Sequence, residues 1–198
     1  AGGVTSAQLL HGSANPIGGQ SAIIKLKWGR SAEEMKIPDA PGFIKFALGE
    51  NVKQSNWGDN QRERFPQTRM GVEQVYYDYF LRARDYATSV GKADAEASKF
   101  RLFRRETPPL RRDLELEALA EILDSTRFIS CHSYVQSEVN MLMHVADSMG
   151  FRVNTFTHIL EGYKLADKMR EHGVAGSTFA DWWAYKFEVN DAIPYNAA

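Results

Sequence analysis

Residues 128–134, FISCHSY, and residues 153–162, VNTFTHILEG, decide how this chain is expected to fold. Each segment is a short run of apolar, β-branched or aromatic residues that closes on a histidine, His132 or His158, and then turns polar. Such runs predict buried strands. The helical pattern between them, at residues 137–149, predicts a strand–helix–strand unit and therefore a parallel sheet. Parallel sheets carry their chemistry at the carboxyl ends of their strands, and both histidines fall there.

The alternation of strand and helix patterns extends along the rest of the chain. Apolar residues at spacings of three and four predict helices over residues 71–90, 113–123, 137–149 and 163–171. Strand patterns cover residues 4–10, 22–26, 43–48, 128–131, 152–157 and, more weakly, 176–179. This order favours an α/β fold.

The composition allows one domain with a sizeable core. The 198 residues are 43% hydrophobic and 12% aromatic, but a closed (β/α)8 barrel needs roughly 250 residues. The 24 basic and 25 acidic residues nearly cancel, so the charge gives no case for a nucleic-acid partner. No apolar run reaches the length of about 18 residues that a membrane span requires. The single cysteine, Cys131, excludes an internal disulfide and is expected to be buried.

Two polar segments interrupt the pattern. Residues 51–69 are expected to form a polar loop that helps to cover a site, and residues 91–112 to form a charged, solvated insertion. The first residues, AGGVTSAQLL, lack the features of a signal peptide and are similar to the interior of a domain, so the compartment cannot be read. We interpret the start as internal.

Histidines at neighbouring strand ends form a candidate metal pair. Imidazole nitrogen suits zinc and similar divalent ions, although a strand-end histidine can equally be a hydrogen-bonded structural residue. Lys45 stands inside the apolar run GFIKFALGENVK at residues 42–53, and Glu50 follows at its end. A lysine buried in a parallel sheet is costly unless it is paired, neutralised or covalently modified. Lys45 is therefore expected to be paired, neutralised or covalently modified in the fold.

Five segments in order resemble the metal-dependent amidohydrolase superfamily, in particular its imidazolonepropionase-like members. They are FIKFALGENVK (43–53), RFPQTRMG (64–71), RRDLELEALAEIL (111–123), ISCHSY (129–134) and FTHILEGYKLADKM (156–169). The resemblance runs over nearly the whole chain. It implies an incomplete TIM-type (β/α)8 barrel that holds approximately strands 2 to 7 of eight, in a single partial domain over residues 1–198.

The resemblance also implies a set of metal ligands. In that family one or two divalent ions are held by a His-x-His pair on strand 1, a carboxylated lysine or a glutamate, one histidine each on strands 5 and 6, and an aspartate on strand 8. His132 matches the strand 5 histidine and His158 the strand 6 histidine. Lys45 or Glu50 matches the bridging acidic ligand, with a slight preference for Glu50, because Lys45 precedes it by five residues. The expected cofactor is a divalent metal, zinc in the first instance, with a carboxylated lysine as the alternative bridge.

The chain departs from the family pattern in two places. It contains no His-x-His, and its remaining histidines are His11, His144 and His172. The final strand with its aspartate, which in such enzymes is the general base, is missing as well, so the general base is expected outside this chain. We interpret the sequence as part of a longer enzyme or as a truncated homologue.

The expected function is metal-dependent hydrolysis of a C–N bond in a cyclic amide or related non-peptide substrate through a metal-activated water. Tyr134, Glu161 and Tyr163, which follow the two histidines, are the candidate substrate-binding residues. The alternative is a catalytically inactive scaffold, derived from such a barrel, that binds a ligand or partner. The expected partners are a small-molecule substrate and, because an incomplete barrel leaves two sheet edges, a second copy of the chain or the remainder of a parent chain.

Overall fold

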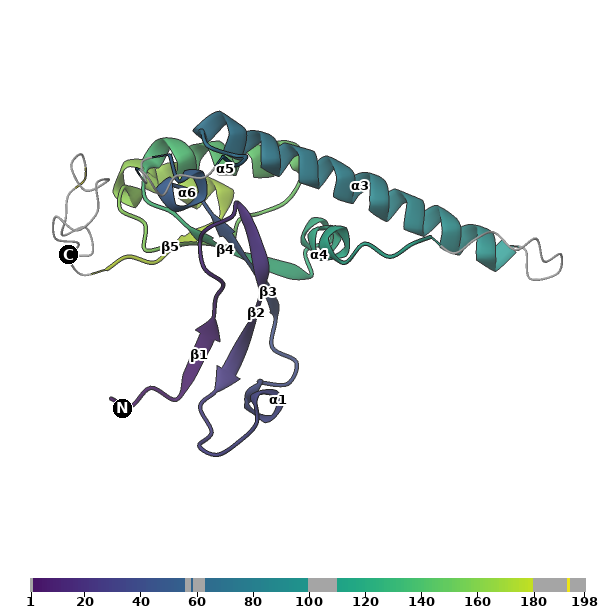
Figure 1. Ribbon diagram of the computed structural model, residues 1–198, viewed down its shortest axis with the longest axis horizontal. Helices are drawn as coiled ribbons and strands as arrows, with labels where there is room; N and C mark the ends of the chain where they lie inside the picture. The colour runs from purple at the N-terminus through teal and green to yellow at the C-terminus, as the bar shows by residue number, and fades with distance from the viewer. Residues whose placement is uncertain (1, 56–57, 59–62, 100–109, 180–191, 193–198) are drawn as a thin grey trace.

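The structure, a computed structural model, describes residues 2–55, 58, 63–99, 110–179 and 192. Six strands form one curled sheet, a half-barrel, in the order of the sequence. They are β1 (Ser6–Leu9), β2 (Ile17–Lys25), β3 (Gly42–Ala47), β4 (Arg127–His132), β5 (Thr155–Thr157) and β6 (Ala175–Gly176). Figure 1 shows the strands below a layer of helices.

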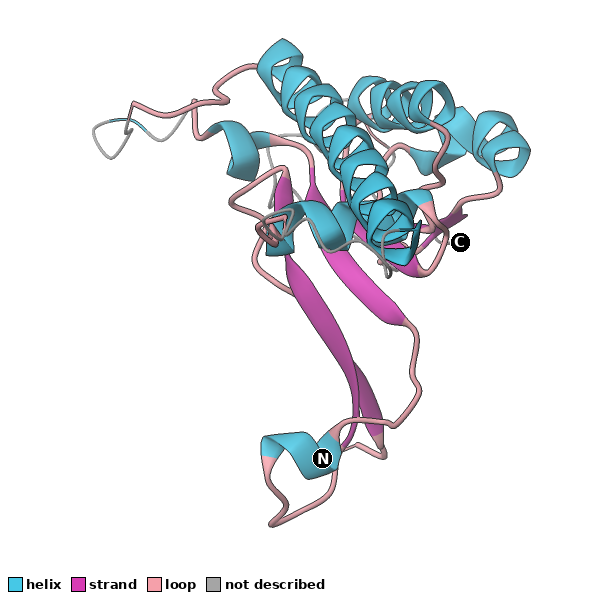
Figure 2. Cartoon of the chain, turned by 90° about the vertical axis from the view of Figure 1, so that its right-hand side faces the viewer, coloured by secondary structure: helices cyan, strands magenta, loops and turns pink. Residues whose placement is uncertain are grey.

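The helices lie on one face of the sheet (Figure 2). They are α1 (Ala32–Met35), α2 (Glu50–Lys53), α3 (Arg69–Lys99), α4 (Leu114–Leu123), α5 (Gln136–Met149), the 3-10 turn η2 (Gly162–Leu165) and α6 (Ala166–His172). The longest, α3, packs against α4 and α5. The short helix α1 stands apart from this layer, at the far end of the sheet (Figure 1).

The four strands β3 to β6 are parallel, which confirms the strand–helix–strand unit predicted around residues 137–149. The register pairs Lys45 with Ser130 and Ala47 with His132. By contrast, β1 pairs antiparallel with β2, and β2 pairs antiparallel with β3. β1 therefore points the same way as β3 to β6 and β2 runs against them, so the described sheet departs at β2 from the all-parallel arrangement of a (β/α)8 barrel.

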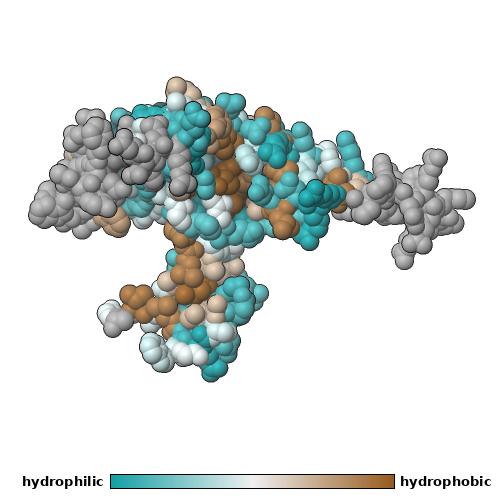
Figure 3. Space-filling view, viewed as in Figure 1, coloured by the Kyte–Doolittle hydropathy of each residue, from teal (hydrophilic) through white to brown (hydrophobic). Residues whose placement is uncertain are grey.

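The strands β1 and β2 form an arm that projects from the body of the molecule (Figure 1). Brown, apolar surface lies along this arm in Figure 3. Large side chains are exposed along and beside it. They are Val4, Leu9, Leu10, Leu26 and Trp28. β2 begins at Ile17, and Gly18 and Gly19 lie where its register shifts. The pairs Ile17–Phe46 and Gln20–Ile44 flank them, so the two glycines form an irregularity between paired parts of the strand.

Aromatic rings join the sheet to the helix layer. Phe46 on β3 lies 5.2 Å from the ring of Tyr76 and 6.1 Å from that of Phe80, both on α3. Phe80 in turn stacks on Phe151 at 4.0 Å. All four side chains are buried, and such ring pairs add to the stabilisation that apolar burial provides. This core faces the helices, so residues at alternate strand positions face the opposite way.

Several element boundaries differ from the sequence-based expectations. The loop expected over residues 51–69 begins inside α2, and residues 56–57 and 59–62 lie outside the described part. The insertion expected over residues 91–112 begins as helix, because α3 continues to Lys99; residues 100–109 lie outside the described part. The residues after Gly91 are rich in alanine, glutamate and lysine, which favour helix strongly enough to pass one glycine.

The last two strands are shorter than predicted. β5 covers only the end of the expected strand 152–157, because the side chain of Asn154 accepts the backbone N–H of Ile129 at 2.7 Å in place of a strand carbonyl. β6 covers Ala175–Gly176 rather than residues 176–179. Cys131 is buried, as predicted, and burial raises the pKa of its thiol. Among the described helices, none has the length and apolar character needed to cross a membrane.

The hydroxyl of Tyr76 provides a test of how β2 is held to β3. It donates to the carbonyls of Pro16 and Ala47 at 2.8 Å each and is fully buried. Tyr76→Phe is expected to lower the free energy of unfolding by about 1–3 kcal/mol, because the buried carbonyl of Ala47 loses the hydroxyl donor and that of Pro16 keeps the backbone N–H of Ala47 alone of its two donors. Urea denaturation measures this loss.

The neighbouring Tyr77 gives the matched control. Its hydroxyl accepts the hydroxyl of Ser148 at 3.2 Å, at an exposed position. Tyr77→Phe is expected to change the free energy of unfolding by less than about 0.5 kcal/mol. Equal losses in the two variants would mean that the Pro16 and Ala47 contacts contribute nothing specific.

Candidate functional site

The histidines of the two quoted segments meet at the carboxyl ends of β4 and β5. Their ring centroids lie 4.3 Å apart with an interplanar angle of 76°. His132 is the last residue of β4 and is buried. His158 follows β5 directly and adopts a left-handed backbone conformation, with φ of 45°, which is uncommon for a residue with a side chain. The structure therefore brings together two side chains that the sequence placed only at neighbouring strand ends.

Aromatic rings enclose the pair. Tyr134 contacts His132 edge-on at 4.7 Å and lies 5.0 Å from His158. Phe179 stacks on His158 at 6.1 Å. Of these two rings, the sequence singled out only Tyr134, although Phe179 also lies at the end of a predicted strand. The strand-end rule that identified the histidines could have identified Phe179 too.

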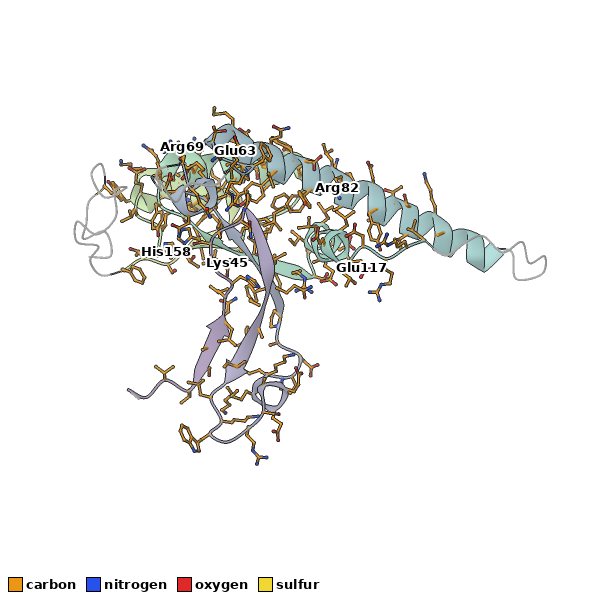
Figure 4. The ribbon with its side chains drawn as sticks, in the orientation of Figure 1. Lys45, Glu63, Arg69, Arg82, Glu117 and His158 are labelled. Atoms are coloured by element: carbon orange, nitrogen blue, oxygen red, sulfur yellow. The ribbon has the colours of Figure 1, made fainter. Side chains whose placement is uncertain are left out.

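Lys45 lies on the same face of the sheet as His132. In β3 and β4 the residues with odd and even numbers alternate between faces, and Ile44, Phe46, Ile129 and Cys131 face the helix-side core. The register then places Lys45 and Ala47 beside Ser130 and His132 on the other face. In Figure 4 Lys45 and His158 lie on the same side of the helix layer. Lys45 is only 6% exposed, and burial lowers the pKa of its amine.

Glu50 occupies a different position from Lys45. It is the first residue of α2, at the rim beyond the end of β3. Its carboxylate accepts the hydroxyl of Ser55 at 3.2 Å and lies 3.8 Å from the ammonium group of Lys53. β3 ends at Ala47, so Lys45 stands two positions before the strand end, and Glu50 three positions beyond it. Lys45 is therefore nearer to the end of β3 than Glu50 is, whereas the preference for Glu50 assumed that Lys45 lies far from that end.

A buried carboxylate supports the rim behind Tyr134. Glu138, on the first turn of α5, is 4% exposed and lies 3.1 Å from Arg69 and 3.5 Å from Lys53. Because Lys53 ends α2 and Arg69 begins α3, the carboxylate joins the end of α2 to the starts of α3 and α5. Sequence reasoning missed Glu138, since nothing in the pattern of α5 distinguishes it from a solvent-facing acid.

Glu161 and Tyr163 do not surround the histidines as Tyr134 does. The carboxylate of Glu161 accepts the backbone N–H of Gln136 at 2.6 Å and pairs with Lys164, so it caps the start of α5. Tyr163 is 41% exposed and lines a separate hollow with Ile159 and Met169. Glu161 and Tyr163 can therefore bind substrate, as the sequence suggested, only if the substrate extends beyond the histidine pair.

A larger cavity than this hollow lies elsewhere. It has a volume of about 850 Å³ and lies between β2, α3 and α4 on the helix side of the sheet. Its lining includes Ile17, Ile44, Tyr79, Arg82 and Leu119. Ile44 faces the core and Lys45 the opposite face, so this cavity does not open on the histidine pair.

The donors for a metal ion are few within the described residues. No group of three or more histidine, cysteine, aspartate or glutamate side chains there could hold an ion. His144 is exposed on α5, and His172 is held by Asp147 at 2.7 Å and by the backbone N–H of Val153 at 3.2 Å. The chemistry of the site within this chain therefore centres on His132, His158 and Lys45.

Comparisons with known proteins bear on the fold and on the family. The amidohydrolase tasK of Hapsidospora irregularis is 28% identical over 216 residues, which cover 98% of this chain and 21% of that protein. The crystal structure of an amidohydrolase from Thermotoga maritima MSB8 superposes with a TM-score of 0.81 at 29% identity, over 97% of this chain and 46% of that one. The comparisons support an amidohydrolase family. The chain spans about a fifth and about half of the lengths of these two relatives. No family model matches the sequence.

Glu161 provides a test that separates support from substrate binding. Glu161→Ala is expected to lower the free energy of unfolding by about 1–3 kcal/mol, because the buried N–H of Gln136 loses its acceptor. The exposed Glu171 on α6 is the control, and its alanine variant is expected to stay within about 0.5 kcal/mol of the parent. Urea denaturation of both variants checks this. Unchanged stability in Glu161→Ala would return Glu161 to the substrate-binding role.

Proposed function

We propose that this chain carries part of the active site of a metal-dependent hydrolase that cleaves C–N bonds in small amide substrates. The observation that carries the proposal is the contact between His132 and His158 at adjacent ends of parallel strands, with Lys45 on the same face. The two amidohydrolase relatives support the hydrolase class. The imidazolonepropionase-like subtype, with cyclic amides as substrates, and the incomplete (β/α)8 barrel are parts of the same proposal.

The residues present fit a divalent ion such as zinc. Imidazole nitrogen is a preferred zinc ligand, and the two rings are near enough for both to reach one ion. A third ligand cannot be a cation. The amine of Lys45 can provide an anionic ligand once it has reacted with carbon dioxide. When bound, such an ion supplies an activated water at neutral pH and polarises the carbonyl group under attack.

Burial favours the form of the Lys45 amine that reacts with carbon dioxide. The lowered pKa increases the fraction of neutral amine, which is the form that attacks carbon dioxide. The nitrogen–carbon bond that forms gives a carbamate and releases one proton. The product is an anion with two oxygens, so it removes the buried cation and adds a ligand. Glu50 remains the alternative, but its carboxylate already lies beside Lys53 and Ser55.

The other residues of this face orient and shield the site. The backbone N–H of His158 donates to the hydroxyl of Ser177 at 3.3 Å, which fixes the turn that carries the ring. Tyr134 and Phe179 cover the imidazoles and exclude water from one side. We propose Tyr134 as the substrate-contacting ring nearest the histidines, with Glu161 and Tyr163 as more distant contacts.

Metal content tests the proposal. The purified chain is expected to retain a divalent ion, measured by elemental mass spectrometry after dialysis, and His132→Ala/His158→Ala to lose it. His144→Ala removes an exposed histidine from α5 and is expected to retain the parent's metal content. A parent chain without metal, or a double variant with undiminished metal, would sink the proposal and favour the non-catalytic scaffold.

A second pair of variants decides whether Lys45, as a carbamate, or Glu50 provides the anionic ligand. Lys45→Gln is expected to lower the bound metal at least about tenfold, because an amide cannot form a carbamate. Glu50→Gln is expected to retain it, since its carboxylate interacts at the rim. The reverse result, measured as metal per chain at fixed free zinc, would assign the ligand to Glu50.

A further inference from the structure

His11 lies directly against the glycine pair of β2. A Cβ atom added to Gly19 would fall 2.2 Å from both Cδ2 and Nε2 of the His11 imidazole. No side chain at position 19 is compatible with that ring position. The glycine at position 19 therefore leaves room for an imidazole above the strand.

The Cβ atoms of His11 and Lys45 both lie close to Gly18. The point that a Cβ of Gly18 would occupy lies 3.6 Å from the Cβ of Lys45 and 3.7 Å from the Cβ of His11. Lys45 shares its face of the sheet with His132. His11 thus extends the row of nitrogen-bearing side chains across β2, β3, β4 and the end of β5.

The segment that carries His11 is fixed to the end of β3. The side chain of Asn51, on α2, donates to the hydroxyl of Ser13 at 2.7 Å. Arg64 donates to the carbonyl of Ala14 at 2.8 Å and to the side chain of Asn15 at 3.1 Å. Together with the bond from Tyr76 to Pro16, these contacts hold residues 13–16 from three separate elements. His11 is exposed, but the chain that follows it is held in place.

The neighbouring carboxylates are each paired with a lysine or an arginine. Glu138 lies beside Arg69 and Lys53, and Glu161 pairs with Lys164. The three acids of the rim, Glu50 included, each lie within 4 Å of a lysine or arginine. Negative charge from these residues therefore does not oppose an anionic ligand at this face.

We propose that His11 contacts the substrate and binds a carboxylate at the end remote from the cleaved bond. The substrate part of this inference rests on the proposed amide hydrolysis. Strands are about 4.8 Å apart, so His11 on the β2 side lies about 10 Å from His132 on β4. A small amide with a terminal carboxylate, such as an N-acyl amino acid, spans that interval. An imidazole N–H bonds a carboxylate more strongly than a neutral acceptor.

The test titrates the whole chain with N-acetylglycine and, in parallel, with its neutral analogue N-acetylglycinamide. The imidazole signals are followed by NMR, and His11 is identified by its absence in His11→Gln. The His11 signal is expected to shift saturably with N-acetylglycine and to need at least about ten times more N-acetylglycinamide, as expected when a charge-assisted hydrogen bond is lost.

Two variants sharpen the test. Gly19→Ala keeps His11 but pushes its imidazole away, so it is expected to weaken N-acetylglycine binding about as much as His11→Gln does, by about 10- to 100-fold. His144→Gln, on the exposed side of α5, is expected to bind like the parent. Equal affinity for the two probes, or undiminished affinity in His11→Gln, would overturn the proposal.

Metal content and amide hydrolysis, measured on the same samples, separate this inference from the proposed function. A chain that binds N-acetylglycine through His11 but holds no metal and cleaves no amide would leave the carboxylate site standing and remove the hydrolase. A chain that holds metal and cleaves N-acetylglycine and N-acetylglycinamide equally well, with His11→Gln unchanged, would leave the hydrolase standing and remove the role of His11.

Discussion

The parallel register of β3, β4 and β5 is the constraint on which the site depends. It sets Lys45 beside Ser130 and His132 beside Thr157, and a shift by one residue would turn every one of these side chains to the helix side. The aromatic core on that side, around Phe46, fixes the register because its rings fit only between the sheet and α3. Packing on one face therefore determines the chemistry on the other.

The acids of this region act mainly as supports. Glu138 joins the end of α2 to the starts of α3 and α5, and Glu161 caps α5 from a position 25 residues along the chain. Each carboxylate is buried beside a cation or a backbone donor, which is the condition under which a buried charge is tolerated. These contacts hold the strand-end segments that carry Tyr134 and His158 without placing a carboxylate between the imidazoles.

Sequence patterns could predict the parallel half of the sheet and the meeting of its histidines, because hydrophobic period and helix ends are local signals. Asp113 caps α4 and Gly150 ends α5 through contacts within a few residues. The antiparallel pairing of β2 with β1 and β3 has no such signal, since both strand directions share the period of two. Glu138 was missed for a related reason: its partners Lys53 and Arg69 are distant in sequence, and only the fold brings them together.

Charge balance favours the proposed carbamate at Lys45. An ammonium group beside the two imidazoles would repel a divalent cation, while the nearby carboxylates already face lysines and an arginine. A carbamate at Lys45 would replace the positive charge by a negative one on the same face as His132. The buried amine with its lowered pKa is then no longer a cost to the fold, because the same burial that disfavours the ammonium form favours the reactive amine.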